Sequence, residues 1–160
     1  MKTKTLRLPL PFILPLLCSL LVALTLPAST YYQCVRVIDG DTIVVMMDGR
    51  QERVRLIGVD TPETVHPEKP VERFGKEASD FTKRIVQGKM IRLEYDGNKR
   101  DRYNRLLAYV YLEDGTFLNA EIIRLGYGFA YTRFPFRYID EFREYEREAR
   151  ENGRGLWKGR

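Results

Sequence analysis

Residues 33–59 read QCVRVIDGDTIVVMMDGRQERVRLIGV and carry the strongest signal for the fold. Apolar runs rich in β-branched residues, over 35–38, 43–47 and 54–59, alternate here with Asp-Gly turns. Short runs bounded by Asp and Gly are typical of strands. Asp48-Gly49 also favours a two-residue hairpin turn, because both central positions of that turn need positive φ. We therefore predict three strands joined by short turns.

The rest of the chain supplies two further strands and three helices. Extended apolar runs over 90–95 and 106–112 predict the strands. Apolar residues at spacings of three and four predict helices over 71–85, 119–125 and 138–149, each followed by a glycine. Because strands and helices are segregated along the chain, the class is α+β. The order of the elements predicts a five-stranded Greek-key barrel of the oligonucleotide-binding (OB) fold, with three helices packed around it.

The length of 160 residues suits one domain, and the composition suits a folded one. Hydrophobic residues make up 44% of the chain and charged residues 31%, which excludes a disordered or fibrous protein. The formal net charge is +5, and it falls to +2 if the N-terminal segment is removed, because Lys2, Lys4 and Arg7 account for three positive charges. Bulk charge is therefore only a weak indication of a polyanionic partner.

The N-terminal segment has the pattern of a secretory signal peptide. A basic stretch over 1–7 precedes twenty uncharged residues, 8–27, and small residues follow. A membrane anchor is the alternative, since about 20 apolar residues can span a bilayer, but prolines at positions 9, 11 and 15 would break the first half of such a helix. We predict a signal peptide over 1–30 and one domain over 31–160. The protein is then secreted or periplasmic, or anchored in the membrane if the leader stays uncleaved.

The inventory of reactive side chains narrows the possible chemistry. Cys18, Cys34 and the single His66 are too few for a closed zinc site or a disulfide framework. Beyond the leader Ser79 is the only serine, so the sequence offers almost no residues from which to build a Ser-His-Asp triad. Cleavage of the leader would leave Cys34 alone in an oxidising compartment, which predicts burial or intermolecular pairing. Catalysis must use carboxylates, arginines, lysines or tyrosines.

Acidic residues follow two of the predicted strands. The motif DGDT at 39–42 is by itself typical of a polar turn. The motif DTPET at 60–64 has the pattern of a helix capping box, but Pro67 and Pro70 leave little helix to cap. Two acidic side chains near a barrel rim then need another partner, and a hard cation is the obvious one.

Arginines on the predicted strands are candidates for phosphate binding. The motif DRYNR at 101–105 lies in a basic turn whose other cations suit a solvated surface. Arg105 differs, because it begins a predicted strand, as Arg55 lies within one. A guanidinium on a rigid strand can bind phosphate through two hydrogen bonds and keeps its charge at any working pH. The charges over 140–151, in contrast, suit a solvated helical face with pairs such as Glu146 and Arg150.

The stretches VIDGDT (37–42), RLIGVDTPET (55–64) and DRYNRLLAY (101–109) resemble the signature stretches of the thermonuclease family, the staphylococcal nuclease-like proteins. The resemblance extends from about Val35 to Trp157, and three motifs in order with matching spacing are specific. It implies an OB-fold barrel that cleaves DNA and RNA phosphodiesters in a calcium-dependent reaction and leaves 3′-phosphates. It also implies a monomer that prefers single-stranded substrates.

The resemblance implies a calcium site. Asp41 and Asp60 would supply carboxylate oxygens to Ca²⁺ and Thr61 its backbone carbonyl, with waters completing the shell. This set suits Ca²⁺, which prefers six to eight oxygen ligands. From the residues alone, two carboxylates and a carbonyl suit several hard cations, including Mg²⁺ and Mn²⁺.

The resemblance also implies catalytic and substrate-binding roles. Arg55 and Arg105 would hold the scissile phosphate and stabilise the charge that develops on it. Glu63 would act as general base for the attacking water. The positions implied to contact substrate are Lys69, Tyr103 and Tyr131.

One departure from the family pattern lies at residue 104, and one alternative function also stays open. Asn104 stands where the best-known member has glycine, and because asparagine tolerates a left-handed backbone, we expect the turn to be kept. The alternative function is an inactive nuclease-like barrel that only binds nucleic acid or protein. The joint presence of five charged residues argues against it, because a binding module needs no general base: Asp41, Arg55, Asp60, Glu63 and Arg105.

Overall fold

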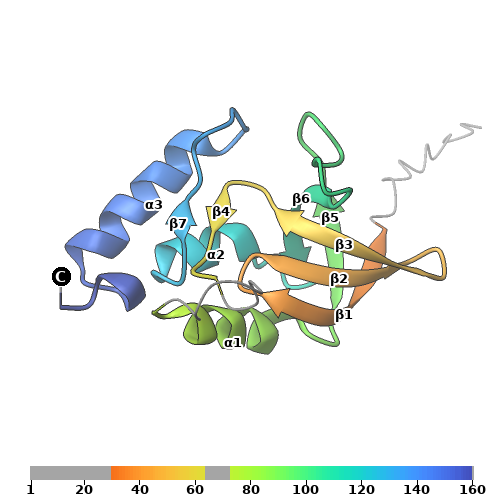
Figure 1. Cartoon of the computed structure of the whole chain (residues 1–160), viewed down its shortest axis with the longest axis horizontal. Helices are drawn as coiled ribbons and strands as arrows, with labels where there is room; N and C mark the ends of the chain where they lie inside the picture. The colour runs from red at the N-terminus through yellow and green to blue at the C-terminus, as the bar shows by residue number, and fades with distance from the viewer. Residues whose placement is uncertain (1–29, 64–72, 160) are drawn as a thin grey trace, which may run out of the picture.

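The computed structural model describes residues 30–63 and 73–159 (Figure 1). Lys69, and the predicted leader apart from Thr30, lie outside these residues. The strands are β1 (Tyr31–Asp39), β2 (Thr42–Met47), β3 (Arg50–Leu56), β4 (Val59–Asp60), β5 (Met90–Glu94), β6 (Leu106–Leu112) and β7 (Phe129–Ala130). The helices are α1 (Gly75–Val86), α2 (Leu118–Arg124) and α3 (Ile139–Glu151), followed by a 3₁₀ turn, η1 (Gly155–Trp157).

Five strands close into a barrel in the order β1-β2-β3-β6-β5. Neighbouring strands are antiparallel except β3 and β6, which run parallel with Val54 opposite Leu106. The barrel closes where the start of β1 pairs with β5. With three helices beside the barrel, this is the predicted α+β OB-type architecture, and that prediction is confirmed.

The hairpin between β2 and β3 forms as its sequence predicts. Asp48 and Gly49 have φ values of 51° and 76°, so both central residues of the turn are left-handed. This conformation matches the twist of the flanking strands. The turn sets the register of β3, with Ile43 opposite Val54 and Thr42 opposite Arg55.

Alternation along the strands separates the core from the surface. On β3, Val54 and Leu56 are buried inside the barrel, while Arg53 and Arg55 take the outward positions. Cys34 is fully buried in the core, as one of the two predicted outcomes for this cysteine required. Other core side chains come from all parts of the domain: Ile43, Val45, Ile91, Ala108, Val110, Leu118, Ile122, Ile123 and Phe142.

The three helices pack against the barrel and against the short sheet of β4 and β7 (Figure 1). Helix α1 packs against β1 and α2, and α2 also packs against α3. The sequence predicts a first helix from residue 71, but the structure begins it at Gly75, because Phe74 has a φ of 73° and interrupts the helical backbone. Helix α3 carries the expected surface ion pairs, including one of 2.7 Å between Arg150 and Glu146.

The strand predicted over 54–59 is two strands. The chain turns at Gly58, which has a φ of 72°, so β3 ends at Leu56 and β4 pairs with β7 in a separate two-stranded sheet. A Cβ atom on Gly58 would lie 2.6 Å from the ring of Phe136, so this close approach admits only glycine. Periodicity could not show the break, because every residue around it is apolar.

Candidate active site

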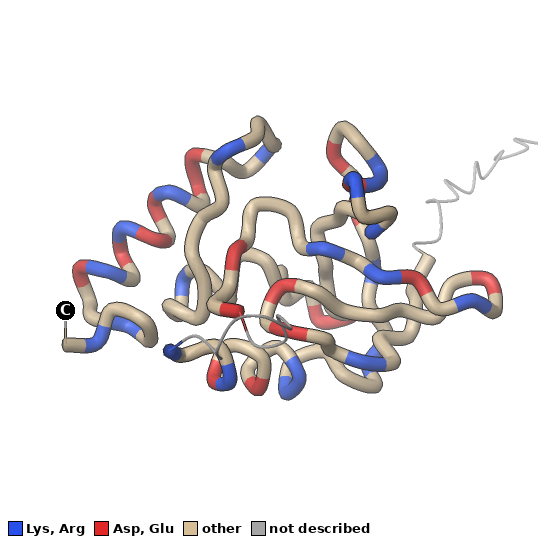
Figure 2. Tube along the Cα trace, in the orientation of Figure 1, with Lys and Arg blue, Asp and Glu red and all other residues tan. Residues whose placement is uncertain are grey.

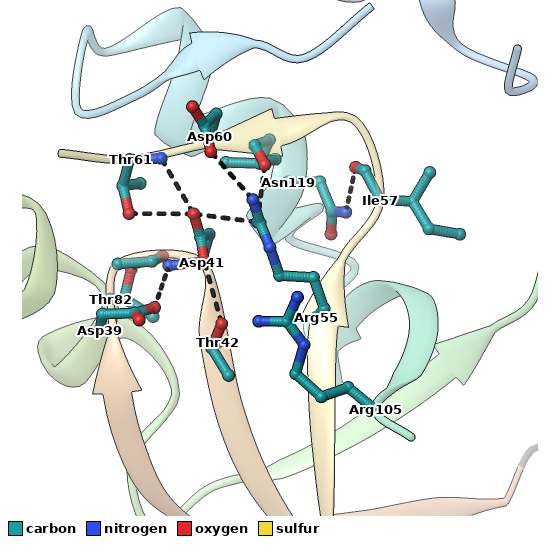
Figure 3. Close-up of polar contacts among 12 residues, drawn as sticks. Asp39, Asp41, Thr42, Arg55, Ile57, Asp60, Thr61, Thr82, Arg105 and Asn119 are labelled. Carbon is teal, nitrogen blue, oxygen red and sulfur yellow. Dashed lines mark hydrogen bonds and ion pairs between the residues drawn. The ribbon is translucent and has the colours of Figure 1, made fainter. Parts of the chain in front are cut away.

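One polar pocket of about 210 Å³ lies at the edge of the barrel where β2, β3 and β4 meet (Figure 3). It contains all of the residues that the sequence singled out for metal binding and catalysis. A further carboxylate, Asp39, also lines it. The lining residues are Asp39, Asp41, Arg55, Asp60, Thr61, Glu63 and Arg105.

The turn between β1 and β2 is built around Gly40. The amide of Asp41 donates to the carboxylate of Asp39 at 3.2 Å. The buried hydroxyl of Thr82, on α1, donates to the carbonyl of Gly40 at 2.7 Å. A Cβ atom on Gly40 would lie 2.8 Å from the side chain of Thr61, so glycine lets the turn pack directly on that residue. The helix thus holds the turn that carries two acidic side chains.

Asp41 is the most enclosed carboxylate of the pocket, with 6% of its surface exposed. Its Oδ1 atom accepts from the hydroxyl of Thr42 at 2.9 Å. Its Oδ2 atom accepts from the amide of Thr61 at 2.9 Å and from the Thr61 hydroxyl at 3.2 Å. Hydrogen bonds and a nearby cation offset the cost of burying a carboxylate.

Arg55 bridges the two carboxylates that are predicted to bind the metal. Its Nη1 atom lies 2.9 Å from Oδ2 of Asp41, and its Nη2 atom donates to Oδ1 of Asp60 at 3.0 Å. Nη1 also donates to the carbonyl of Val59 at 2.7 Å. The Arg55 side chain is 15% exposed, whereas that of Asp60 is 50% exposed. The guanidinium therefore has one enclosed ion pair and one that faces solvent.

Asn119 supports the turn that leads from β3 to β4. Its amide nitrogen donates to the carbonyl of Ile57 at 2.9 Å (Figure 3). It also donates to the carbonyl of Ala108 at 3.3 Å. Its side-chain oxygen accepts from the amide of Val110 at 2.9 Å. Asn119 and Thr82 were both missed by the sequence analysis. The available signal was a polar residue on an otherwise apolar helix face.

Arg105 enters the pocket from the loop before β6. Its Nε atom donates to Asp101 at 2.8 Å, and its own amide donates to the same carboxylate at 3.0 Å. Burial opposes ionisation of Asp101, but the hydrogen bonds and charge of Arg105 outweigh it and hold the pKa of Asp101 below its usual value. Asn104 has a φ of 61°, which confirms the expected left-handed turn. In Figure 3 the side chain of Arg105 extends toward Arg55.

Two carboxyl groups, those of Asp39 and Asp41, lie close together on the side of the pocket formed by the β1–β2 turn. Burial, together with the neighbouring carboxylate of Asp41, raises the pKa of Asp39 to about 7. Within residues 30–63 and 73–159, no group of three or more His, Cys, Asp or Glu side chains is placed to hold a metal ion. Among the oxygen donors of the pocket are the three predicted ligands, the carboxylates of Asp41 and Asp60 and the carbonyl of Thr61. This set of hard oxygen donors, beside a carboxyl group that resists ionisation, fits a hard divalent cation.

The predicted substrate-contacting tyrosines lie outside the pocket lining. Tyr103 is 56% exposed and lies in the same loop as Arg105, whose guanidinium carbon is 5.4 Å from the centre of its ring. Tyr131 follows β7, and its amide donates to the carbonyl of Gly58 at 2.9 Å. Its ring lies 6.1 Å from that of Phe134.

Comparison with known proteins identifies the family. A family model described as "Staphylococcal nuclease homologue" matches residues 53–159, which is more than half of the chain. The chain belongs to the staphylococcal nuclease family. Among its curated relatives, the thermonuclease of Staphylococcus hyicus is 46% identical over 127 residues, which cover 79% of this chain and 75% of the relative.

Other relatives in the staphylococcal nuclease family carry similar names. The thermonuclease of Staphylococcus intermedius is 45% identical over 130 residues, covering 79% of this chain and 76% of the relative. The endonuclease YncB of Bacillus subtilis (strain 168) is 42% identical over 125 residues, covering 76% of this chain and 59% of the relative. These similarities support the prediction that this member of the family is a nuclease that hydrolyses phosphodiester bonds.

Proposed function

We propose that this protein is an exported, calcium-dependent nuclease that hydrolyses DNA and RNA and leaves 3′-phosphates. One observation carries the proposal: two arginines, Glu63 and the two carboxylates predicted to bind the cation line a single pocket of about 210 Å³. A phosphodiester is anionic and resists attack by water, so its hydrolysis needs positive charge and a base in one place. Membership of the staphylococcal nuclease family supports the same reaction class.

Arg55 and Arg105 bind the scissile phosphate in this proposal. Both side chains are held in place by neighbouring groups. Arg55 contacts Asp41 and the carbonyl of Val59. Arg105 donates a hydrogen bond to Asp101. Anchored donors need little reorganisation when charge builds up on the phosphate oxygens. The enclosed Asp41 balances the charge of Arg55 and orients it.

Asp41, Asp60 and the carbonyl of Thr61 would hold the divalent cation. When bound, the cation supplies electrostatic stabilisation of the phosphoryl oxygens. Asp41 is restrained by Thr42 and Thr61, so its carboxylate is held in one orientation. Asp60 is half exposed, and its carboxylate would supply the second charged ligand.

Glu63 acts as the general base. It lines the pocket three residues after Asp60, so it can take a proton from a water that attacks the phosphorus. The bond between phosphorus and the 5′-oxygen then breaks, the 5′-oxygen takes up a proton from water, and the phosphate remains on the 3′-side. Exposed Tyr103 offers a stacking surface for a base, and Lys69 and Tyr131 are further substrate contacts in this proposal.

Export by the N-terminal segment completes the proposal. Residues 1–30 would act as a signal peptide and deliver a monomeric enzyme outside the cytoplasm. No helix in the described part of the chain, 30–63 and 73–159, is long and apolar enough to cross a membrane.

The deciding experiment measures hydrolysis of single-stranded DNA and RNA by the purified chain with Ca²⁺, with Mg²⁺ and with a chelator. Glu63→Gln is compared with Glu113→Gln, a matched change on an exposed turn outside the pocket. We expect calcium-dependent cleavage that Glu63→Gln lowers by at least about 100-fold, while binding of DNA and the Glu113→Gln rate stay close to wild type.

Two results would overturn parts of this proposal. Equal rates for Glu63→Gln and wild type would remove Glu63 from the mechanism. DNA binding without cleavage under any metal, by a folded protein, would replace the enzyme with a nucleic-acid-binding barrel.

A further inference from the structure

Arg53 continues the line of Arg55 along the outer face of the barrel. Both residues take outward positions of β3, opposite Val44 and Thr42 of β2. Two residues along an antiparallel strand span about 6.8 Å, since the rise per residue is about 3.4 Å. This is roughly twice the 3.4 Å rise per nucleotide of a stacked DNA strand. An unstacked single strand can therefore present successive phosphates to these two positions.

Arg53 is exposed, and its charge is not matched by a neighbouring carboxylate of the described chain. Within residues 30–63 and 73–159, no acidic side chain lies within ion-pair distance of Arg53 or of Arg102, which is also exposed. The arginines of α3 differ, because Arg143, Arg147 and Arg150 each pair with an acidic residue of the same helix. The positive charge of Arg53 and Arg102 is thus not neutralised within the described chain and is available to a polyanion.

The loop after β5 brings an aromatic ring to this charged position. Nη2 of Arg53 donates to the carbonyl of Tyr103 at 3.3 Å, and the guanidinium of Arg102 lies 4.7 Å from the centre of the Tyr103 ring. Arg105 lines the pocket, and its guanidinium carbon lies 5.4 Å from the centre of the same ring. Tyr103 therefore connects the pocket to Arg53. Figure 2 shows basic residues along β3 and on this loop, which lies above β3 in that view.

We propose that Arg53 forms an outer phosphate subsite, which binds the nucleotide next to the scissile phosphate of a single strand. The inference rests on the proposed nuclease function and specifies its substrate as a chain longer than a dinucleotide. The scissile phosphate lies at Arg55 and Arg105, the adjacent base stacks on Tyr103, and the next phosphate lies at Arg53. Stacking and charge without base-edge contacts bind single strands with little sequence preference.

The test compares substrates that can and cannot reach Arg53. A dinucleotide has one phosphodiester and fills only the pocket, whereas a single-stranded dodecamer also reaches β3. Arg53→Ala in the full-length chain should raise KM for the dodecamer roughly tenfold, as expected when one charge-assisted hydrogen bond is removed. Its kcat on both substrates and its KM for the dinucleotide should stay at wild-type values. Arg84→Ala is the matched control, because Arg84 is an exposed arginine of α1 without an ion pair to a described residue.

Binding of the dodecamer in chelator gives a readout that is independent of cleavage. Because Arg53→Ala neutralises one phosphate fewer, the slope of log affinity against log salt should become shallower by about 0.7. An unchanged slope and an unchanged KM for the dodecamer would overturn the proposal. A slower reaction with the dinucleotide would also overturn it, because Arg53 would then act by holding the loop that carries Arg105. If wild type cleaves neither substrate, the nuclease function fails, but the salt slope still decides whether Arg53 contacts a phosphate.

Discussion

The guanidinium of Arg55 lies 2.9 Å from the carboxylate of Asp41, and both side chains are largely enclosed. Asp41 thereby fixes the orientation of Arg55 while also accepting hydrogen bonds from Thr42 and Thr61. The second partner of Arg55, Asp60, is half exposed. The two ion pairs of Arg55 therefore differ in how strongly solvent screens them.

Asp41→Asn should destabilise the protein far more than Asp60→Asn. Asp41→Asn leaves Arg55 with only its solvent-screened partner and costs about 3 kcal/mol, as for an enclosed pair that loses one member, whereas a solvent-screened pair contributes about 0–1 kcal/mol. Urea unfolding in chelator measures both variants without any contribution from a bound cation. Equal losses would show that Asp41 does not hold the charge of Arg55 in the folded state.

Thr82→Val should weaken the fold by about 1–3 kcal/mol, the usual cost of a buried carbonyl that loses its donor. The change keeps the shape of the side chain but removes the hydroxyl that donates to Gly40. Thr82→Ser keeps the hydroxyl, so it should recover much of that loss in the same urea titration. If Thr82→Ser is as unstable as Thr82→Val, packing rather than the hydrogen bond explains the effect.

Tyr109→Phe should make the protein more sensitive to acid. The Tyr109 hydroxyl donates to Asp96 at 2.7 Å and, with the amide of Arg137, holds the pKa of Asp96 below its usual 3.8. A lowered pKa in the folded state stabilises the protein above pH 3.8, and this contribution is lost as the pH falls through the folded-state value. Without the hydroxyl, the midpoint of acid unfolding should move to a higher pH.

Tyr111→Phe is the control for the acid measurement. The Tyr111 hydroxyl contacts the hydroxyl of Tyr138, at 3.3 Å, instead of a carboxylate. Removal of this hydroxyl should therefore leave the pH midpoint of acid unfolding closer to the wild-type value. Circular dichroism measures this midpoint for both variants. The same shift in both variants would assign the effect to altered packing instead of Asp96.

Cys34 should resist thiol reagents in the folded protein. Burial raises the pKa of its thiol from 9.0 to about 11, so at pH 8 the reactive thiolate is both scarce and inaccessible. In a Cys18→Ser chain, Ellman's reagent should label Cys34 only after denaturant is added. The neutral thiol also favours folding below pH 9, and this contribution is lost as the pH rises through 11. Rapid labelling in native buffer, or a disulfide-linked dimer, would contradict the burial.

Local patterns explain why much of the fold was predictable. The Asp48-Gly49 hairpin and the left-handed Asn104 depend on residues that tolerate positive φ, and both form as expected. Apolar periodicity likewise predicted the five barrel strands and the three helices. The need for glycine at position 58 was less predictable, because the space there is closed by the ring of Phe136, a residue far along the chain.

The amino-acid sequence by itself determined the residue types of the pocket and the elements that carry them, since strand alternation and turn chemistry act over a few residues. Tertiary structure alone decided which of these residues meet. Asp41 and Asp60 come together through Arg55, and Thr82 and Asn119 hold the two turns from helices distant in sequence. Such contacts depend on closure of the barrel and the packing of α1 and α2 beside it, which no local pattern encodes.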